Sequence, residues 1–301
     1  MRVSVCGVCR TDLHLAEGDL VSRRGDTVPG HEAVGEVCAL GPGAGRLPIG
    51  TRVGIAWLAS TCGTCRYCRA GRENLCLGPT FTGWDHDGGF AEYAVAHEDY
   101  VYRLPDRFDD EAAAPLLCAG IIGYRALRRS GAASGGQLGI YGFGASAHLT
   151  LQMARAEGIE VHVMTRSAEA RRLALELGAA SAQGPVDVPP VALDAAILFA
   201  PVGSLVPPAL AALGRGGTLA VAGIHLSDIP ALDYDRCLFE ERTLTSVTAN
   251  TRRDGEEFLQ LADRAVIRPT TSVYPLDRVD QALEDLAADR VNGAAVIRVR
   301  F

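Results

Sequence analysis

Hydrophobic and polar positions follow two different patterns along this chain. Up to about residue 119, short β-branched runs alternate with glycine- and proline-rich segments, as at Val34–Val37, Arg52–Ile55 and Ala91–Val95. Such runs, separated by turn signals, are typical of β-strands joined by irregular loops. We therefore expect a mostly β domain over residues 1–119.

The pattern changes near residue 120, where apolar runs begin to alternate with amphipathic segments. Runs such as QLGIYGFG and EVHVMTRS read as strands, and HLTLQMARAEG between them reads as a helix. In a further helix over 168–177, the apolar positions Leu173, Leu175 and Leu177 stand among charged residues. The alternation predicts βαβ units, and hence an α/β domain with a doubly wound parallel sheet over residues 120–253. Residues 254–301 carry two more helix patterns and a final strand, AAVIRVRF.

Composition narrows the possible functions. The 301 residues carry a net charge of −7 and are 48% hydrophobic. This acidic balance disfavours nucleic-acid binding, and no apolar run approaches the roughly 18 residues of a membrane span. The N-terminal segment lacks the features of a secretory signal, so we expect a cytoplasmic protein with neither nucleic acid nor membrane as partner. Cysteines are reduced in that compartment, which favours metal binding over disulfides.

Four of the nine cysteines form a local cluster with metal-ligand spacing. Within CGTCRYCRAGRENLC stand Cys62, Cys65, Cys68 and Cys76. Four thiolates in one short lobe can surround a tetrahedral zinc and leave no open position, which indicates a structural rather than a catalytic ion. An iron–sulfur cluster, or a set of unrelated buried thiols, would also use four cysteines.

A second candidate set is dispersed along the chain. Cys9 lies in GVCRTDLH, His31 and Glu32 lie in PGHE, and Cys118 lies in APLLCAGIIGYRAL. Two thiolates and one imidazole would leave a fourth position open, as in catalytic zinc sites. Spacing alone does not select this set, because single buried cysteines and histidines packed in a core are common.

A glycine-rich loop indicates dinucleotide binding. Gly142, Gly144 and Ala147 form a G-x-G-x-x-A pattern that directly follows an expected strand and opens an expected helix. Glycines there permit a tight turn and close approach of a pyrophosphate, whose charge the amides at the helix N-terminus stabilise.

The end of the next expected strand discriminates between cofactors. An NAD-binding domain usually places a carboxylate there, but this strand ends in Thr165, Arg166 and Ser167. A guanidinium and hydroxyl groups would bind a 2′-phosphate, so the sequence predicts a preference for NADP(H) over NAD(H). An ordinary solvated arginine at this position is the alternative.

Taken in order, these motifs resemble the zinc-dependent alcohol dehydrogenases of the medium-chain dehydrogenase/reductase superfamily. GVCRTDLH, PGHE, the four-cysteine segment, GGFAEYAV and APLLCAGIIGYRAL all occur in the family's order. The resemblance implies a GroES-like catalytic domain over 1–119, a Rossmann domain over 120–253, and a segment over 254–301 that returns to the catalytic domain. It implies an active site in the cleft between the domains.

The family's activity supplies the expected reaction. The resemblance implies hydride transfer between a nicotinamide cofactor and a primary or simple secondary alcohol or its carbonyl product, in a homodimer or homotetramer. There are two alternatives to this activity. The protein could be a polyol or sugar-alcohol dehydrogenase, or a truncated relative that binds dinucleotide without turnover. Relatives carry some thirty further residues before the first zinc motif. Either the start of the sequence is misassigned, or the sequence is a fragment, or the protein works without those strands, which would leave a sheet edge unpaired.

The resemblance also assigns roles to individual residues. It implies a catalytic zinc held by Cys9, His31 and Cys118, with Glu32 as a nearby or transient ligand, and a structural zinc held by the four-cysteine cluster. Thr11 matches the hydroxyl residue that hydrogen-bonds the substrate oxygen. The remaining roles are a proton relay for His14, a nicotinamide contact for Gly223 and a phosphate contact for Arg252.

Several of these residues also have simpler interpretations. Thr11 can be a turn residue, His14 a solvated histidine and Arg252 a surface charge. Trp57 and Trp84, the two tryptophans, are candidate walls of an apolar substrate pocket or packing residues. We expect the other three cysteines to be small buried apolar residues; they are Cys6, Cys38 and Cys237.

Overall fold

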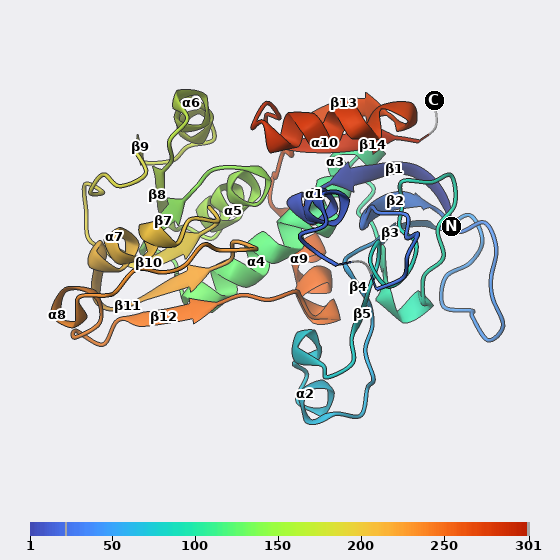
Figure 1. Ribbon diagram of the computed structural model, residues 1–301, viewed down its shortest axis with the longest axis horizontal. Helices are drawn as coiled ribbons and strands as arrows, with labels where there is room; N and C mark the ends of the chain where they lie inside the picture. Colours follow the sequence, from blue (N-terminus) through green and yellow to red (C-terminus); the bar gives the residue numbers. More distant parts are fainter. Residues whose placement is uncertain (22, 300–301) are drawn as a thin grey trace. The chain divides into compact units, whose positions relative to one another are not determined.

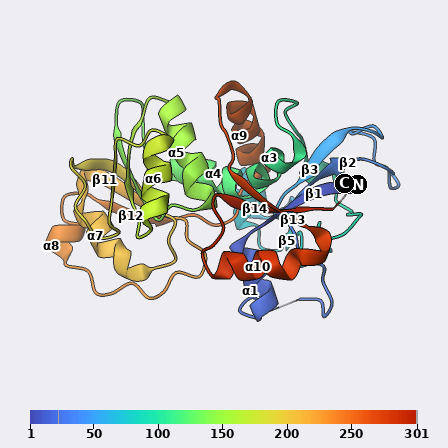
Figure 2. The same cartoon turned by 90° about the horizontal axis from the view of Figure 1, so that it is seen from above.

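The computed structural model describes residues 1–21 and 23–299, which form two compact units (Figure 1; Figure 2). The first unit comprises Met1–Ile121, Ala249–Asp263 and Arg268–Phe301; the second comprises Ile122–Thr248 and Arg264–Ile267. The domain boundaries expected at residues 119 and 253 remain a prediction. In the described part of the chain, every helix is too short or too polar to cross a membrane.

The first unit is built on a six-stranded sheet with the order β13-β14-β1-β2-β3-β6. Its strands are β1 (Arg2–Val8), β2 (Glu32–Glu36), β3 (Arg52–Ile55), β6 (Val101–Arg103), β13 (Thr271–Pro275) and β14 (Ala294–Arg298). All neighbours are antiparallel except β13 and β14. The blue strand β1 therefore lies beside the red strand β14, which comes from the other end of the chain (Figure 1).

Short elements and helices complete the first unit. A two-stranded sheet forms from β4 (Leu58–Ser60) and β5 (Thr80–Phe81). The helices are α1 (Arg10–Glu17), α2 (Arg66–Arg69), α3 (Asp110–Ala113), α9 (Arg252–Arg264) and α10 (Val279–Ala287), with 3-10 turns η1 (Glu73–Leu75), η2 (Glu98–Tyr100), η3 (Ala114–Leu117) and η5 (Leu276–Arg278). Helix α10 packs beside α1 and against β14 (Figure 2). Its apolar face contributes Ala282 to a core with Val8 and Ile297.

The second unit is a parallel sheet with the strand order β12-β11-β10-β7-β8-β9. The strands are β7 (Gln137–Tyr141), β8 (Glu160–Met164), β9 (Ser181–Gln183), β10 (Leu193–Leu198), β11 (Leu213–Val221) and β12 (Thr243–Ser246). Its helices are α5 (Ala145–Ala156), α6 (Ala168–Glu176), α7 (Val206–Ala211) and α8 (Tyr234–Cys237), with the 3-10 turn η4 (Gly203–Leu205); α4 (Ala119–Ser130) begins in the first unit. This order reverses between β7 and β10, as in a doubly wound dinucleotide-binding sheet, and confirms the predicted parallel sheet.

Three local expectations were wrong. The run Ala91–Val95 is not a strand: Tyr93 forms only an isolated bridge with Arg2, and Val95 is 88% exposed. In α6 the buried residue is Ala174, whereas Leu175 is half exposed, because leucines spaced two apart cannot share one helical face. Cys38 is exposed rather than buried.

His148 predicts an acid-sensitive step in the stability of the second unit. It lies in α5, is 1% exposed, and its Nδ1 donates to the Gly144 carbonyl at 3.3 Å. Burial lowers the pKa of His148 to about 4. Because the unfolded chain takes up this proton near pH 6.5, the native state loses about 2 kcal/mol from this group between pH 7 and pH 5.

Replacing His148 with asparagine, which cannot titrate but keeps an N–H donor, should remove that loss. Urea denaturation of the zinc-loaded wild type and H148N at pH 7 and pH 5 measures the difference. We expect the variant to lose about 2 kcal/mol less than the wild type over this interval. Equal losses in the two proteins would show that His148 does not set the acid sensitivity.

Candidate metal and dinucleotide sites

Four side chains from distant stretches converge in the first unit. One ligand atom from each of Cys9, His31, Glu32 and Cys118 lies within 4.8 Å of the others. His31 Nε2 lies 3.3 Å from Cys118 Sγ, which lies 3.9 Å from Cys9 Sγ. Cys9 is the N-cap of α1, Glu32 begins β2, and Cys118 directly follows η3. The packing of these elements, rather than sequence proximity, builds the group.

Asp12 orients two members of the group, and the sequence analysis did not identify it. This carboxylate is fully buried and accepts hydrogen bonds from the backbone N–H of Cys9 at 2.9 Å and of Gly30 at 3.0 Å. His31 Nδ1 lies 3.3 Å from Asp12 Oδ1, an ion-pair distance, so the ring turns its Nε2 towards the thiols. Carboxylates commonly orient ligating histidines in this way. One feature of the sequence could have pointed to Asp12: it stands three residues after Cys9, the spacing of a capping box at the start of a helix.

Two glycines make room for the buried group. Gly7 pairs with Glu32 across β1 and β2, and a Cβ on Gly7 would lie 2.1 Å from Glu32 Oε2. Gly30 has a φ of +98°, and a Cβ there would meet Phe90 and Cys6 at 2.7–2.9 Å. A side chain at Gly7 would therefore displace Glu32, and a side chain at Gly30, the residue before His31, would collide with Phe90 and Cys6.

The pKa shifts in the converging group show that its buried acidic side chains cannot all carry negative charge unless a cation is bound. Burial raises the pKa of Glu32 well above its ordinary value. The hydrogen bond from Cys118 lowers the pKa of Cys9, and the same contact, together with burial, raises the pKa of Cys118. Buried thiolate charge requires a nearby positive charge. Two sulfurs and an imidazole nitrogen form a donor set that suits zinc, so the residues present fit this metal.

The second cysteine cluster is compact and local. One sulfur from each of Cys62, Cys65, Cys68 and Cys76 lies within 4.8 Å of the others. The measured separations are 3.4 Å for Cys62 and Cys76, 3.6 Å for Cys65 and Cys68, and 4.0 Å for Cys62 and Cys68. Zinc–sulfur bonds of about 2.3 Å in a tetrahedron place sulfurs about 3.8 Å apart. The cluster thus fits a single zinc ion, since an iron–sulfur cluster holds its cysteines farther apart.

Backbone amides support negative charge on this cluster. The N–H of Cys65 donates to Cys62 Sγ at 3.4 Å, and the N–H of Cys62 donates to Cys76 Sγ at 3.3 Å. Backbone hydrogen bonds from Thr64 and Cys65 lower the pKa of Cys62 to about 6. The thiolate form, which binds metal, is therefore accessible near neutral pH at Cys62, whereas burial raises the pKa of Cys68 to about 11.

Arg252 binds this cysteine lobe from α9. Its guanidinium contacts both carboxylate oxygens of Glu73, with Nη2 2.8 Å from Oε2, and its centre lies 4.7 Å from the ring of Tyr100. Its backbone N–H also donates to Glu73 Oε1 at 2.6 Å. Arg252 therefore joins the start of α9 to the lobe, and the expected phosphate contact remains a prediction.

The glycine-rich loop occupies the topological switch point of the parallel sheet. Gly142 follows β7 with a φ of +85°, and a Cβ there would lie 2.8 Å from the backbone nitrogen of Ala200, which follows β10. Gly144 is the N-cap of α5, and a Cβ at this position would meet open space. Ala147, in the first turn of α5, is fully buried. Gly223 follows β11 on the same edge. The turn thus leaves the helix N-terminus open to a pyrophosphate.

A second arginine, Arg171, binds the backbone of the loop after β8. Arg171 Nη1 donates to the carbonyls of Thr165 at 2.8 Å and Arg166 at 3.0 Å. Ser167 caps α6 by accepting from the Ala170 N–H. Sequence analysis missed Arg171, because its side chain reaches back across the first turn of α6.

Comparison with known proteins settles the family. The family model of the alcohol dehydrogenase GroES-like domain matches residues 1–106, and that of the zinc-binding dehydrogenases matches residues 147–264. A Mycobacterium tuberculosis protein named "Probable alcohol dehydrogenase AdhA" is 57% identical over 99% of this chain and 87% of its own length. The chain belongs to the zinc-type medium-chain alcohol dehydrogenases.

Other relatives of this dehydrogenase agree. An alcohol dehydrogenase of Geobacillus stearothermophilus is 37% identical over 100% of this chain and 91% of its own length. The solved structure of a cinnamyl alcohol dehydrogenase from Sorghum bicolor matches 99% of this chain and 88% of its own with a TM-score of 0.91 at 29% identity. The structure of CAD from Helicobacter pylori complexed with NADP(H) has a TM-score of 0.91 at 26% identity, covering 99% and 89%.

Family membership confirms the coarser sequence predictions. The fold combines a GroES-like part with a Rossmann part, and the dehydrogenase is an enzyme of alcohol oxidoreduction with a nicotinamide cofactor and small-molecule substrates. Both cysteine-containing clusters fit zinc.

Two further expected site residues of the dehydrogenase lie on α1. Thr11 is 6% exposed and its Oγ1 accepts from Cys9 Sγ at 3.7 Å, which places the hydroxyl beside the converging group. His14 is one turn further along the helix, and its Nδ1 lies 3.0 Å from Asp19 Oδ2. Thr11 therefore lies at the buried start of α1, beside the converging group, and His14 lies one turn later, next to the exposed carboxylate of Asp19.

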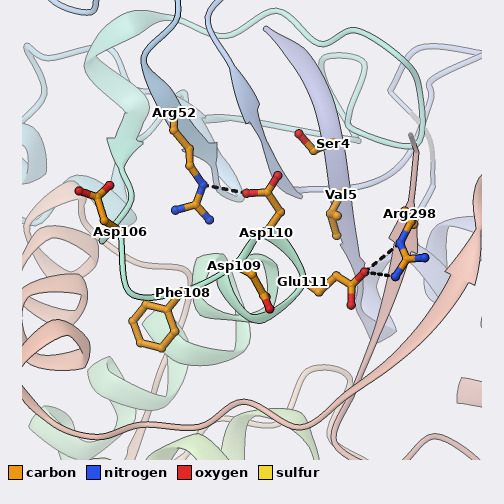
Figure 3. Close-up of a pocket in the computed structure, with 9 residues that line it drawn as sticks. All are labelled: Ser4, Val5, Arg52, Asp106, Phe108, Asp109, Asp110, Glu111 and Arg298. Atoms are coloured by element: carbon orange, nitrogen blue, oxygen red, sulfur yellow. Dashed lines mark hydrogen bonds and ion pairs between the residues drawn. The ribbon is translucent and has the colours of Figure 1, made fainter. Parts of the chain in front are cut away.

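A separate pocket of about 550 Å³ is lined by residues of β1, β3, β14 and α3 (Figure 3). Ion pairs border it on two sides: Arg52 with Asp110 at 2.7 Å, and Arg298 with Glu111. Its lining includes no member of the converging group or of the four-cysteine cluster. The pocket is therefore separate from both candidate metal sites.

Proposed function

We propose that this chain interconverts primary or simple secondary alcohols and their aldehydes or ketones, using one catalytic and one structural zinc. The observation that carries the proposal is the convergence of Cys9, His31, Glu32 and Cys118 within 4.8 Å. Cys9, His31 and Cys118 would hold the catalytic ion, with Glu32 as a transient ligand. When bound, the ion would act as a Lewis acid on the substrate oxygen.

The side chains of α1 would handle the proton. Thr11, beside Cys9, would accept the hydrogen bond of the alcohol hydroxyl and, as it takes that proton during oxidation, release its own hydroxyl proton towards His14. His14, three residues further and on the same helical face, would pass the proton towards solvent past Asp19. The alcohol carbon gives its hydride to the nicotinamide ring, so one hydride and one proton leave the substrate in each turnover.

For the structural ion we propose the four-cysteine lobe. Its four sulfurs match the spacing of a closed tetrahedral shell, which leaves no position for substrate. A homodimer or homotetramer is the assembly that we propose, and size-exclusion chromatography with light scattering would measure it.

For the cofactor we propose NADP(H) in preference to NAD(H). Gly142, Gly144 and Ala147 would bind the pyrophosphate at the start of α5, and Gly223 would lie near the nicotinamide. Support for a 2′-phosphate comes from the hydroxyls of Thr165 and Ser167 and the guanidinium of Arg166. The guanidinium of Arg171 binds the backbone carbonyls of Thr165 and Arg166 and adds positive charge to this loop. A phosphate contact by Arg252 would require it to release Glu73.

Replacing Arg166 with aspartate should reverse the cofactor preference. A carboxylate repels the 2′-phosphate and accepts a hydrogen bond from the 2′-hydroxyl, so kcat/KM should fall about 100-fold for NADP+ and be retained or raised for NAD+. The matched control is Arg172→Ala, since Arg172 is exposed on α6 beside Glu176. Steady-state kinetics with both cofactors measure the ratio. An unchanged ratio in R166D would exclude Arg166 from cofactor selection.

The function itself is tested by metal content and turnover. We expect about two zinc ions per chain, with reduction of NADP+ by ethanol, 2-propanol or benzyl alcohol. Turnover of sorbitol with none of these alcohols would favour the polyol alternative. Dinucleotide binding at full zinc content without turnover of any alcohol would instead identify a non-catalytic relative.

A further inference from the structure

Three aromatic rings stack beside the converging group. The ring centroid of Trp57 lies 4.8 Å from that of Phe81 and 6.0 Å from that of Trp84, with interplanar angles of 19° and 11°. Trp57 also meets His31 edge to face, with the centroids 5.0 Å apart. The stack thus extends directly from the imidazole that would bind the catalytic ion. We call Trp57, Phe81 and Trp84 the aromatic stack.

Trp84 has little support from regular structure. It follows β5 in a tight turn, in which Asp85 N–H donates to the Phe81 carbonyl at 2.9 Å and Asp85 Oδ2 accepts from the Phe81 N–H at 2.8 Å. Trp84 is only partly buried. Its position must therefore be fixed by contacts from outside the turn.

Arg23 supplies two such contacts at once. Its guanidinium carbon lies 3.9 Å from the centroid of the Trp84 ring, and its Nη1 lies 3.0 Å from Asp85 Oδ1. A planar guanidinium can lie flat on an indole and still pair with a carboxylate at its edge, which an ammonium group cannot do equally well. Arg23 thus covers one face of Trp84 and anchors the turn that carries it.

The segment around Arg23 is fastened to the same turn. Trp84 Nε1 donates to the Val21 carbonyl at 2.8 Å, and the Val28 N–H donates to Asp87 Oδ1 at 3.1 Å. The neighbouring Arg24 makes a weaker approach, 3.9 Å from Asp87. These contacts hold the Arg23 side chain, which is 47% exposed, against Trp84.

We infer that Arg23 is a positioning residue for substrate specificity: it holds Trp84 in the aromatic stack, so that the site favours alcohols with a flat aryl group over short alkyl alcohols. The inference rests on the proposed function. Arg23 acts through Trp84, because a ring that is fixed before binding loses less freedom when an aryl group packs against its edge.

The test uses the zinc-loaded full chain with Arg23→Ala, Arg23→Lys and, as matched control, Arg24→Ala. With benzyl alcohol, we expect the KM of R23A to rise about three- to tenfold and its kcat to stay within about twofold; with ethanol, both should stay within about twofold. R23K should fall between R23A and the wild type, since it keeps the charge but loses the planar contact. R24A should behave as the wild type.

Fluorescence gives a readout independent of turnover. Trp57 and Trp84 are the two tryptophans of the chain, so its indole emission reports on the aromatic stack. Acrylamide should quench R23A more strongly than the wild type or R24A, because Trp84 becomes more accessible. Equal quenching, or a benzyl alcohol KM that is unchanged or lower in R23A, would overturn the inference. If the wild type turns over no alcohol, the proposed function fails, while the quenching experiment still decides whether Arg23 holds Trp84.

Discussion

Cys118→Ser will reduce the zinc content from about two ions per chain to about one, and will lower kcat/KM for alcohol oxidation by at least about a thousandfold. The reason is that Cys118 Sγ contacts both His31 Nε2 and Cys9 Sγ, so serine removes the sulfur that joins the other two donors. A neutral hydroxyl is a far weaker zinc ligand than a thiolate. Metal analysis and steady-state kinetics on the purified variant measure the two effects.

Cys38→Ser is the matched control for this experiment. Cys38 is exposed and is not a member of either cysteine-containing cluster, so its replacement should keep two ions and full turnover. A C118S protein that retained both ions and wild-type kinetics would show that Cys118 is not a ligand. The open three-donor site would then have to be abandoned, whereas the four-cysteine lobe would be unaffected.

Asp12→Asn will weaken zinc binding at the converging group about 10- to 100-fold. Asparagine has nearly the same shape, but it is neutral and cannot accept at both positions, so it weakens the contact with His31 and one of the backbone hydrogen bonds from Cys9 and Gly30. His31 and Cys9 then lose their common orientation. Competition with a chromophoric chelator measures the dissociation constant of the weaker ion.

A general loss of stability must be separated from this effect. Asp109 also caps a helix, α3, by accepting from the Ala112 N–H at 2.8 Å, but it does not contact the converging group. Asp109→Ala should therefore lower the melting temperature without changing zinc affinity. Similar zinc affinities for D12N and the wild type would mean that Asp12 acts only as a helix cap.

Local patterns allowed prediction of the fold and of the cysteine lobe. The period of the apolar residues specified the parallel sheet, because its strands are buried on both faces and read as continuous apolar runs. Cys62 and Cys76 lie close in sequence, so spacing alone limited where their sulfurs can lie. Pattern failed at Ala91–Val95, where a β-branched run lacks a neighbouring strand to pair with over its length.

Contacts between distant segments could not be predicted in this way. Resemblance to the family implies a cofactor contact for Arg252, but its carboxylate partner Glu73 is 179 residues away in sequence. Asp12 reads as an ordinary helix residue until β2 brings His31 to it. The choice of Cys9 and Cys118 among the remaining cysteines came from resemblance to a family, since their separation in sequence carries no spacing rule.

The pairing of β1 with β14 has a consequence for how the polypeptide acquires its structure. Val5 lies opposite Arg298, so the antiparallel sheet cannot be completed until nearly the whole chain has left the ribosome. Strands β7 to β12, by contrast, come from one continuous stretch, Ile122–Thr248. We expect the parallel sheet to form first, both in synthesis and in refolding, with the closure of so long a loop as the slower, later step.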